Sequence, residues 1–196
     1  LTYSDMTIFE NRGRRTLNEA STVEEFLGLR ADLGAFALGS YFAELLETVS
    51  AEEYPDPPVL QLGLNSLYAL SRALCPPEQI KAVFELRLMC LAGYEPDLSC
   101  CARCGAPEPA EPWLSLRGGA VYCAQCRGAS SSAVTPLLPE TLAAMRHVVN
   151  ADPKKIFSFT LGDAGRRQLA RVCEEYTAMQ LERGFASLDY WKKVKD

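Results

Sequence analysis

Four cysteines form two close pairs, and their spacing constrains the fold more than any other feature of the sequence. Cys101 and Cys104 have two residues between them, as have Cys123 and Cys126, and 18 residues (105–122) separate the pairs. Two intervening residues let one tight turn direct both thiolates at a single ion, and this spacing is typical of tetrahedral zinc sites. We therefore predict one zinc ion bound by these four cysteines; the alternative is a pair of disulfides or unbound thiols.

The predicted zinc site is of the structural type, because four thiolates fill the coordination sphere and leave no position for water or substrate. Between the pairs, residues 113–116 and 120–122 indicate two short strands joined at Gly118 and Gly119. An insertion of about 30 residues is too short to form a core alone, so the ion stabilises it. Cys100 is an alternative ligand, although the spacing favours its neighbour Cys101.

The composition and the remaining cysteines favour a reducing compartment. The chain has 196 residues, of which 48% are hydrophobic and 23% charged, which suits one sizeable core with a small appendage. No apolar run reaches the roughly 18 residues that span a bilayer, and no secretory signal is visible. The other four cysteines lie in mostly apolar helical patterns, as buried thiols do. They are Cys75, Cys90, Cys100 and Cys173. We predict a cytoplasmic protein.

The net charge of −5 is unevenly distributed along the chain. Residues 1–22 are neutral, residues 23–145 carry −8 and residues 146–196 carry +3. An acidic chain of this kind is not expected to bind a polyanion over its whole surface. Any contact with nucleic acid must therefore be local, or must use residues that this chain lacks.

Residues 1–20 predict β structure, because apolar and polar side chains alternate there and residues 11–14 (NRGR) form a turn. Two strands alone are marginally stable, so this piece is expected to be the end of a small β domain. A helical pattern follows, with an N-cap signal at Ser21 and Thr22 before Glu24 and Glu25.

Helical periodicity then extends over most of the chain. Apolar stripes predict a helix from about residue 29 to 49, and proline pairs introduce two more, at about 59–74 and 78–91, the last ended by Gly93. Short joints make these three helices antiparallel. Further helices are predicted at about 140–150 and from Gly162 to Arg183, closed by Gly184. The predicted fold class is mainly α, a helical bundle with a small four-cysteine insertion.

Little in the sequence indicates catalysis. His147 is the single histidine, it lies within a predicted helix, and nothing pairs with it in sequence. Neither a phosphate-binding loop of the G-x-x-x-x-G-K-[ST] type nor a G-x-G-x-x-G motif is present. We therefore predict a binding protein and not an enzyme.

Three arginines crowd the predicted turn near the N-terminus: Arg12, Arg14 and Arg15. The flanking strands carry Tyr3 and Phe9, and basic residues beside exposed aromatics suit single-stranded nucleic acid through phosphate contacts and base stacking. The alternative is a solvated hairpin tip with the aromatic side chains in a core.

A second basic group lies on the last long predicted helix and consists of Arg166, Arg167 and Arg171. Arg167 and Arg171 are four residues apart and share one helix face. These side chains could bind phosphate, either of DNA or of another anion, or an acidic peptide tail. The alternative is a solvated face whose charge is balanced by Glu174 and Glu175.

In this order of elements the chain resembles the bacterial RecO recombination and repair proteins, and the likeness covers essentially its whole length. The most specific pieces are FELR and LAGYEPD directly before the first cysteine pair. The matching segments are 16–20 (TLNEA), 28–33 (GLRADL), 38–41 (LGSY), 84–88 (FELRL), 91–98 (LAGYEPDL) and 184–189 (GFASLD).

The resemblance implies an N-terminal OB-fold, a helical domain and a four-cysteine zinc insertion. On this reading residues 1–20 are the last strands of the OB-fold β-barrel, 21–98 the first part of the helical domain, 99–130 the zinc insertion and 131–196 the second helical part. The resemblance also implies a non-enzymatic, nucleoid-associated protein that binds single- and double-stranded DNA and anneals strands. Its implied partners are RecR, RecA and the acidic tail of the single-strand-binding protein (SSB).

One departure from the family pattern concerns the start of the chain. RecO-like proteins carry most of the β-barrel before the position of Leu1, so the principal DNA-binding surface is expected to be outside these 196 residues. The acidic composition agrees with that expectation. The alternative function is a zinc-ribbon adaptor that binds protein without direct DNA contact.

Overall fold

The computed structural model describes residues 1–52, 54–130 and 133–195, so residue 131, where the second helical part is predicted to begin, lies outside the described chain. The described residues are mainly helical, as predicted. The helices are α1 (Leu27–Arg30), α2 (Leu33–Val49), α3 (Pro57–Ser71), α4 (Pro77–Leu91), α5 (Pro139–Asn150), α6 (Asp163–Leu181) and α7 (Ala186–Val194). The strands are β1 (Tyr3–Asn11), β2 (Arg14–Glu24), β3 (Trp113–Ser115), β4 (Ala120–Tyr122) and β5 (Val134–Pro136), and η1 (Arg127–Ala129) is a 3₁₀ turn.

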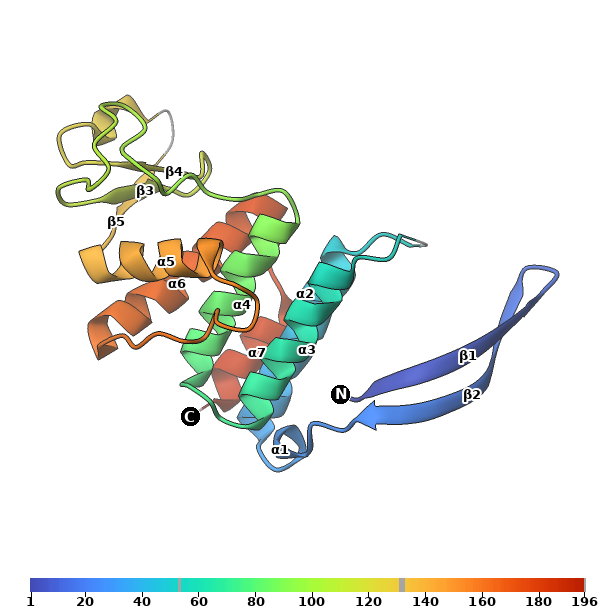
Figure 1. Ribbon diagram of the computed structural model, residues 1–196. Helices are drawn as coiled ribbons and strands as arrows, with labels where there is room; N and C mark the ends of the chain where they lie inside the picture. The colour runs from blue at the N-terminus through green and yellow to red at the C-terminus, as the bar shows by residue number, and fades with distance from the viewer. Residues whose placement is uncertain (53, 131–132, 196) are drawn as a thin grey trace.

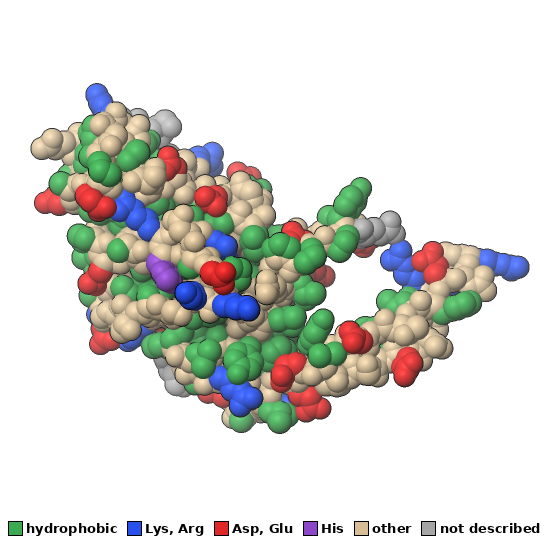
Figure 2. Space-filling view, in the orientation of Figure 1, with side chains coloured by type: hydrophobic (Ala, Val, Ile, Leu, Met, Phe, Trp, Pro, Cys, Tyr) green, Lys and Arg blue, Asp and Glu red, His purple; other side chains and the backbone are tan. Residues whose placement is uncertain are grey.

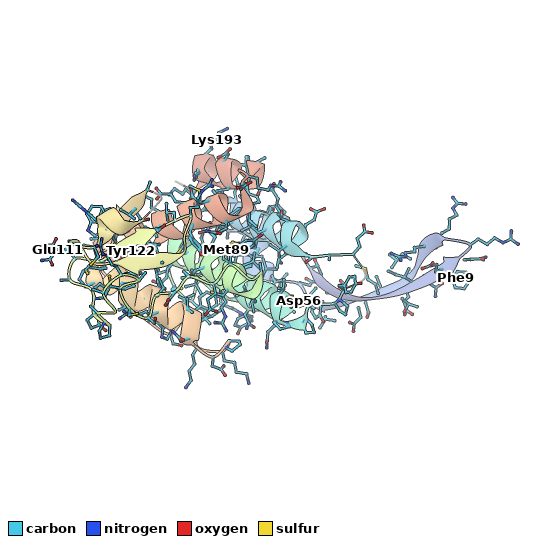
Figure 3. All side chains as sticks on the ribbon, turned by 90° about the horizontal axis from the view of Figure 1, so that it is seen from above. Phe9, Asp56, Met89, Glu111, Tyr122 and Lys193 are labelled. Atoms are coloured by element: carbon cyan, nitrogen blue, oxygen red, sulfur yellow. The ribbon has the colours of Figure 1, made fainter. Side chains whose placement is uncertain are left out.

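The molecule has three parts in space. The helices form a central bundle, the β1–β2 hairpin projects from one side of it, and the small β3–β5 sheet lies at the other end, beyond α5 and α6 (Figure 1). Seen from above, Phe9 lies far out on the hairpin while Met89 lies within the bundle (Figure 3). No helix in the described ranges combines the length and apolar character needed to cross a membrane.

The hairpin is longer than predicted. Strand β2 pairs antiparallel with β1 up to Glu24, and Thr22 lies opposite Ser4. The predicted helix start at Ser21 and Thr22 is therefore wrong. The reason is that the β-branched Thr22 and Val23 favour an extended backbone, and continuing the ladder satisfies backbone groups that a single cap would leave unpaired.

The entry from the hairpin into the bundle uses two local devices. Phe26 adopts a left-handed conformation with φ 47° while its side chain is buried, which turns the chain from β2 into α1. The pattern that predicts one helix from residue 29 is interrupted at Asp32, whose carboxylate accepts a hydrogen bond from Ala35 N at 2.8 Å and caps α2. The break is thus caused by a strong N-cap inside the apolar stripe.

Helix α4 is the centre of the bundle, because α3, α5 and α6 all pack against it. Prolines begin α3 and α4 as predicted, and Gly93 ends α4 with φ 87°. Phe84 stacks on Phe42 of α2 with ring centroids 4.2 Å apart. The core therefore joins helices from both sides of the zinc insertion into one unit.

A network of charges is buried between α4 and α6. Lys81 is 1% exposed, and its Nζ lies 2.9 Å from Glu85 Oε1 and 2.9 Å from Glu174 Oε2. Tyr41 donates its hydroxyl to Glu85 at 2.8 Å. Burial acts to raise the pKa of Glu174, but Lys81 and Lys192 outweigh it and lower that pKa. Each buried charge is therefore paired.

The C-terminal part departs from the predicted pattern in two places. Helix α6 ends at Leu181 and the left-handed residue after it is Glu182, with φ 51°, so the predicted closure at Gly184 is wrong. Helix α7, which no sequence pattern predicted, packs against α2 and buries Trp191. Glu44 of α2 accepts a hydrogen bond from Ser187 N at 3.2 Å, so a carboxylate from a distant element caps α7.

Candidate metal centre

The segment between α4 and α5 forms a small sheet with strand order β4–β3–β5. Strands β3 and β4 are the predicted hairpin, and Gly119 takes the positive φ of 59° that its turn requires, whereas β5 was not predicted. Leu114 and Val121 are fully buried and attach one face to the bundle. On the module, the Arg127 guanidinium lies over the Trp113 ring, 4.2 Å from its centroid. We call residues 94–138 the zinc module, after the ion predicted for it; residues 131 and 132 of this range lie outside the described chain.

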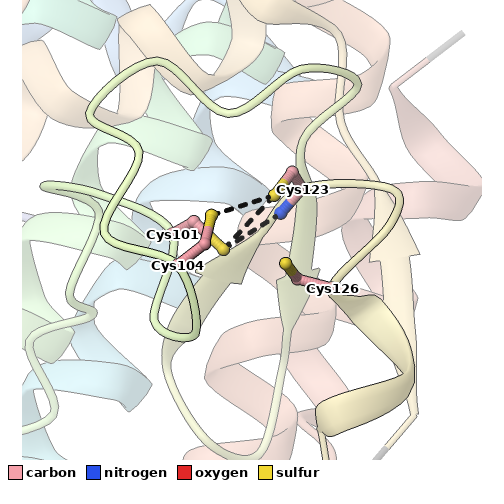
Figure 4. Close-up of side chains that lie close together, drawn as sticks. All are labelled: Cys101, Cys104, Cys123 and Cys126. Carbon is pink, nitrogen blue, oxygen red and sulfur yellow. Dashed lines mark hydrogen bonds between the residues drawn. The ribbon is translucent and has the colours of Figure 1, made fainter.

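The four predicted ligands come together at one point of this module (Figure 4). Their sulfur atoms all lie within 4.8 Å of one another, and Cys123 Sγ is 3.4 Å from Cys101 Sγ and 3.5 Å from Cys104 Sγ. A tetrahedral zinc ion with Zn–S bonds of about 2.3 Å places its sulfurs about 3.8 Å apart. The donor set therefore fits zinc both in chemistry and in size.

Cys100 has a different environment from the four converging thiols. Its Sγ lies 3.7 Å from Ser99 Oγ, and it is not a member of the four-sulfur cluster that could hold a metal. The geometry thus favours Cys101 over Cys100 as the ligand.

The surroundings of the four cysteines do not stabilise their thiolate forms equally. Burial opposes ionisation of Cys101, but backbone N–H groups of Cys104, Cys123 and Arg103 outweigh it and lower the pKa of Cys101 to about 6. Cys123 N, for example, donates to Cys101 Sγ at 3.4 Å. The knuckle backbone is therefore arranged to receive a negatively charged sulfur at this position.

Arg146 of α5 is the main polar link between the module and the bundle. It donates to the carbonyl oxygens of Leu98 (2.7 Å), Ser99 (3.2 Å) and Pro107 (2.6 Å), and pairs with Glu108 at 2.9 Å. All four partners lie in the loop that contains the first cysteine pair. One side chain thus fixes the position of that loop over α5.

Helix α6 holds the other side of the module. Tyr176 donates to Tyr94 O at 2.8 Å, and Gln180 donates to Leu116 O at 2.6 Å. Gln168 accepts from Leu138 N at 2.7 Å and donates to Pro136 O at 3.2 Å, so it pairs with the backbone on both sides of Leu137. Sequence reasoning missed these side chains, because an isolated polar residue in a helix gives no local signal of a distant backbone partner.

The predicted arginine cluster at the hairpin lies at its tip. Arg12 and Gly13 form the turn with positive φ values of 50° and 75°, and lysine or arginine side chains mark the far end of the hairpin in Figure 2. Arg15 pairs with Glu10 at 3.1 Å. Phe9 is 62% exposed near this end, whereas Tyr3 packs against the core at the other. The structure thus places Phe9, but not Tyr3, near the arginine cluster.

The α6 arginines are largely paired with carboxylates. Arg166 lies 2.6 Å from Asp163, and Arg171 bonds both carboxylate oxygens of Glu175. Arg167 is exposed. This arrangement agrees better with a solvated, charge-balanced face than with a dedicated anion site.

His147 belongs to neither arginine group. Its Nε2 lies 3.0 Å from Lys155 O, and its ring meets Phe159 edge-on at 5.2 Å. These contacts hold the loop after α5, which is a structural role.

The FELR segment has a structural explanation. Phe84 stacks in the core and Glu85 belongs to the buried charge network. Arg87 donates to the carbonyl oxygens of Val148 and Val149 at the end of α5. These side chains join α4 to the helices on either side of it.

Comparison with known proteins agrees with this organisation. Residues 30–189 match the family model described as recombination protein O C terminal. The chain is 29% identical over 194 residues to the DNA repair protein RecO of Acetivibrio thermocellus, covering 99% of this chain and 77% of that protein.

Two further relatives carry the same name. The chain is 28% identical to the DNA repair protein RecO of Alkaliphilus metalliredigens, over 98% of this chain and 78% of the relative. It is 29% identical to that of Nocardioides sp., over 96% and 77%. With the family model covering most of the bundle and the zinc module, the chain belongs to the RecO family of DNA repair and recombination proteins.

Proposed function

We propose that this chain acts without catalytic turnover as a mediator of homologous recombination. In this role it binds single- and double-stranded DNA, anneals complementary strands and, with RecR, helps to load RecA onto DNA coated with SSB. The observation that carries the proposal is the family match together with a hairpin that presents arginines away from the acidic bundle. Loading of RecA onto SSB-coated DNA, measured with and without RecR, tests the complete activity.

The four-cysteine cluster is proposed to bind one Zn²⁺ through Cys101, Cys104, Cys123 and Cys126. When bound, the ion supplies a covalent-like crosslink between the two knuckles and no reaction chemistry. The ion is proposed to keep the two knuckles folded together. Arg146 and the α6 side chains hold the backbone of the module on the bundle.

The hairpin is proposed to be the end of an OB-fold whose remaining strands cover it. Met6 and Ile8 on β1 share one face with their partners Ala20 and Leu17 on β2, and the three larger side chains are each more than half exposed. An isolated hairpin with an apolar face is only marginally stable in water, so we expect this face to pack against further strands. A structure of a longer chain that left this face exposed would contradict the assignment.

Replacing both Arg12 and Arg14 by alanine is expected to weaken binding to single-stranded DNA. If each side chain contacts one phosphate, the slope of log K against log salt decreases in magnitude by about 1.4, since each contact on a single strand contributes about 0.7. Fluorescence anisotropy with a labelled oligothymidine across a salt series measures this slope.

A charge-matched control uses the α6 arginines. The Arg166→Ala, Arg171→Ala variant removes the same charge, but from side chains that Asp163 and Glu175 already pair. A larger loss of affinity in this variant than in the hairpin variant would place the DNA contact on α6. No binding by the unmodified protein at low salt would favour the protein-only adaptor.

The acidic tail of SSB is proposed to dock in a pocket of about 290 Å³ between α3, α4 and the loop after α5. The pocket is lined by Pro58, Gln61, Leu62, Asn65, Arg87, Leu91, Pro153 and Ile156. Lys154 and Lys155 lie between two of these residues in sequence, and Figure 2 shows basic side chains gathered beside the single histidine on this face. An apolar pocket with a basic rim suits a peptide that combines apolar and acidic side chains.

The Gln61→Glu, Asn65→Asp variant adds two negative charges to this pocket with little change in volume. Binding of a fluorescent peptide carrying the acidic tail is expected to weaken roughly tenfold, or about 1.4 kcal/mol. The matched control, Asn18→Asp with Gln125→Glu, adds the same charge on the hairpin and the zinc module. Equal weakening by both variants would show a general charge effect and no specific pocket.

A further inference from the structure

The four sulfurs of the metal centre differ in their access to solvent. Cys101 is 1% exposed, Cys123 and Cys126 are half-buried, and Cys104 is exposed. The Cys101 sulfur is therefore protected from solvent, and the Cys104 residue is open to it. A reagent from solution meets Cys104 first.

Hydrogen bonding adds to this difference. Three backbone N–H groups are directed at the Cys101 sulfur, and such donors withdraw charge from a thiolate and lower its nucleophilicity. The Cys104 sulfur lies 3.5 Å from the Cys123 sulfur, a contact that joins the two knuckles. The Cys123 sulfur lies equally near the Cys101 sulfur, at 3.4 Å, so exposure to solvent and not distance favours Cys104 as its partner.

From this asymmetry we propose that the metal centre is a peroxide-sensitive switch in which Cys104 and Cys123 form a disulfide and release the metal. This inference rests on the metal binding in the proposed function. The Cys104 thiolate attacks one oxygen of hydrogen peroxide, the O–O bond breaks, and protonation of the departing hydroxide gives water and a sulfenic acid. The Cys123 thiolate attacks that sulfur, the S–O bond breaks, and the departing hydroxide takes a proton from solvent to give a second water. Two electrons from the two sulfurs reduce one peroxide.

The expected consequence is local opening of the module. After oxidation only Cys101 and Cys126 remain as thiolates, too few to hold a structural zinc ion. The loop from Leu98 to Pro107 then keeps its contacts with Arg146 but loses the crosslink that fixes its far side. The bundle side of the module stays attached while the outer knuckles become mobile.

Trypsin separates Cys101, Cys104 and the second cysteine pair onto three peptides, and fragmentation of the joined peptides in the mass spectrometer distinguishes Cys123 from Cys126. Cleavage after Arg87, Arg103, Arg117 and Arg127 places Cys101 on peptide 88–103, Cys104 alone on 104–117 and the second pair on 118–127. Zinc content is measured first in the reduced protein. Peroxide is then added, released zinc is read with a chelating dye, free thiols are blocked and the digest is analysed by mass spectrometry.

One zinc ion released per disulfide, with peptide 104–117 joined to 118–127 through Cys123, is the expected result, and a thiol reductant with added zinc reverses it. The Cys100→Ser variant should behave identically. Zinc retained under peroxide, loss of zinc without a disulfide, or a first crosslink that involves peptide 88–103 would overturn the proposal. Absence of zinc from the reduced protein would instead refute the metal-binding part of the proposed function.

Discussion

Removing the proposed zinc ion is expected to unfold the outer part of the zinc module and to lower the melting temperature by roughly 10 °C. Structural zinc sites contribute about 10 kcal/mol or more to the folding of small domains. Without the ion, the loop that buries Leu98 loses its crosslink, and a fully buried aliphatic side chain contributes about 1.5–3 kcal/mol. A loss of only about 4 kcal/mol already shifts the midpoint of a chain of this size by about 10 °C.

Thermal unfolding with and without a chelator measures the overall loss of stability, and hydrogen exchange under the same conditions distinguishes the zinc module from the helical bundle. Amides of residues 99–130 should lose protection, whereas those of α2, α3 and α4 should retain it. Chelator saturated with magnesium is the control for ionic effects. An unchanged melting temperature in protein shown to be metal-free would contradict a structural role for the ion.

Replacing Lys81 by methionine is expected to lower the free energy of unfolding by about 3–5 kcal/mol, because it leaves the buried Glu85 carboxylate without its cation. Burial raises the pKa of Glu85. In the variant this carboxyl takes up a proton more readily in the folded state than in the unfolded state. The loss in free energy of unfolding should therefore be largest near about pH 8 and decrease as the pH falls. The reason is that a carboxyl whose pKa is higher in the folded state than in the unfolded state adds stability only where it is protonated, at lower pH.

A compensated variant distinguishes loss of charge balance from loss of packing. Lys81→Met combined with Glu85→Leu and Tyr41→Phe removes the ion pair together with the Tyr41 hydroxyl, which donates a hydrogen bond to Glu85. Glu174 keeps Lys192 as a partner. Urea unfolding should show most of the stability recovered. If the triple variant is as unstable as Lys81→Met, the defect comes from packing and not from an unpaired charge.

The parts of the fold that follow local rules could be predicted from the sequence. Proline at the start of α3 and α4 and Gly93 after α4 mark helix ends through backbone geometry that needs no partner. The four cysteines were expected to converge because a metal requires it, and their sulfurs do lie together.

The parts that depend on distant contacts could not be predicted. Helix α7 is short, and its N-terminus is capped by Glu44 from another helix. Strand β2 continues through an apparent capping signal because β1 lies beside it. The anchoring of the module by Arg146 and Gln168 depends on which carbonyl groups the folded chain brings near them, and a one-dimensional pattern contains no such information.

The two tryptophans lie in different parts of the molecule, and this gives the chain two separable optical signals. Trp191 is buried in the bundle, whereas Trp113 lies in the zinc module beneath the Arg127 guanidinium. A variant with phenylalanine at position 191 would therefore emit from the module alone. Its tryptophan fluorescence would follow the state of the knuckles in real time, and the reciprocal variant, with phenylalanine at position 113, would report on the helical core.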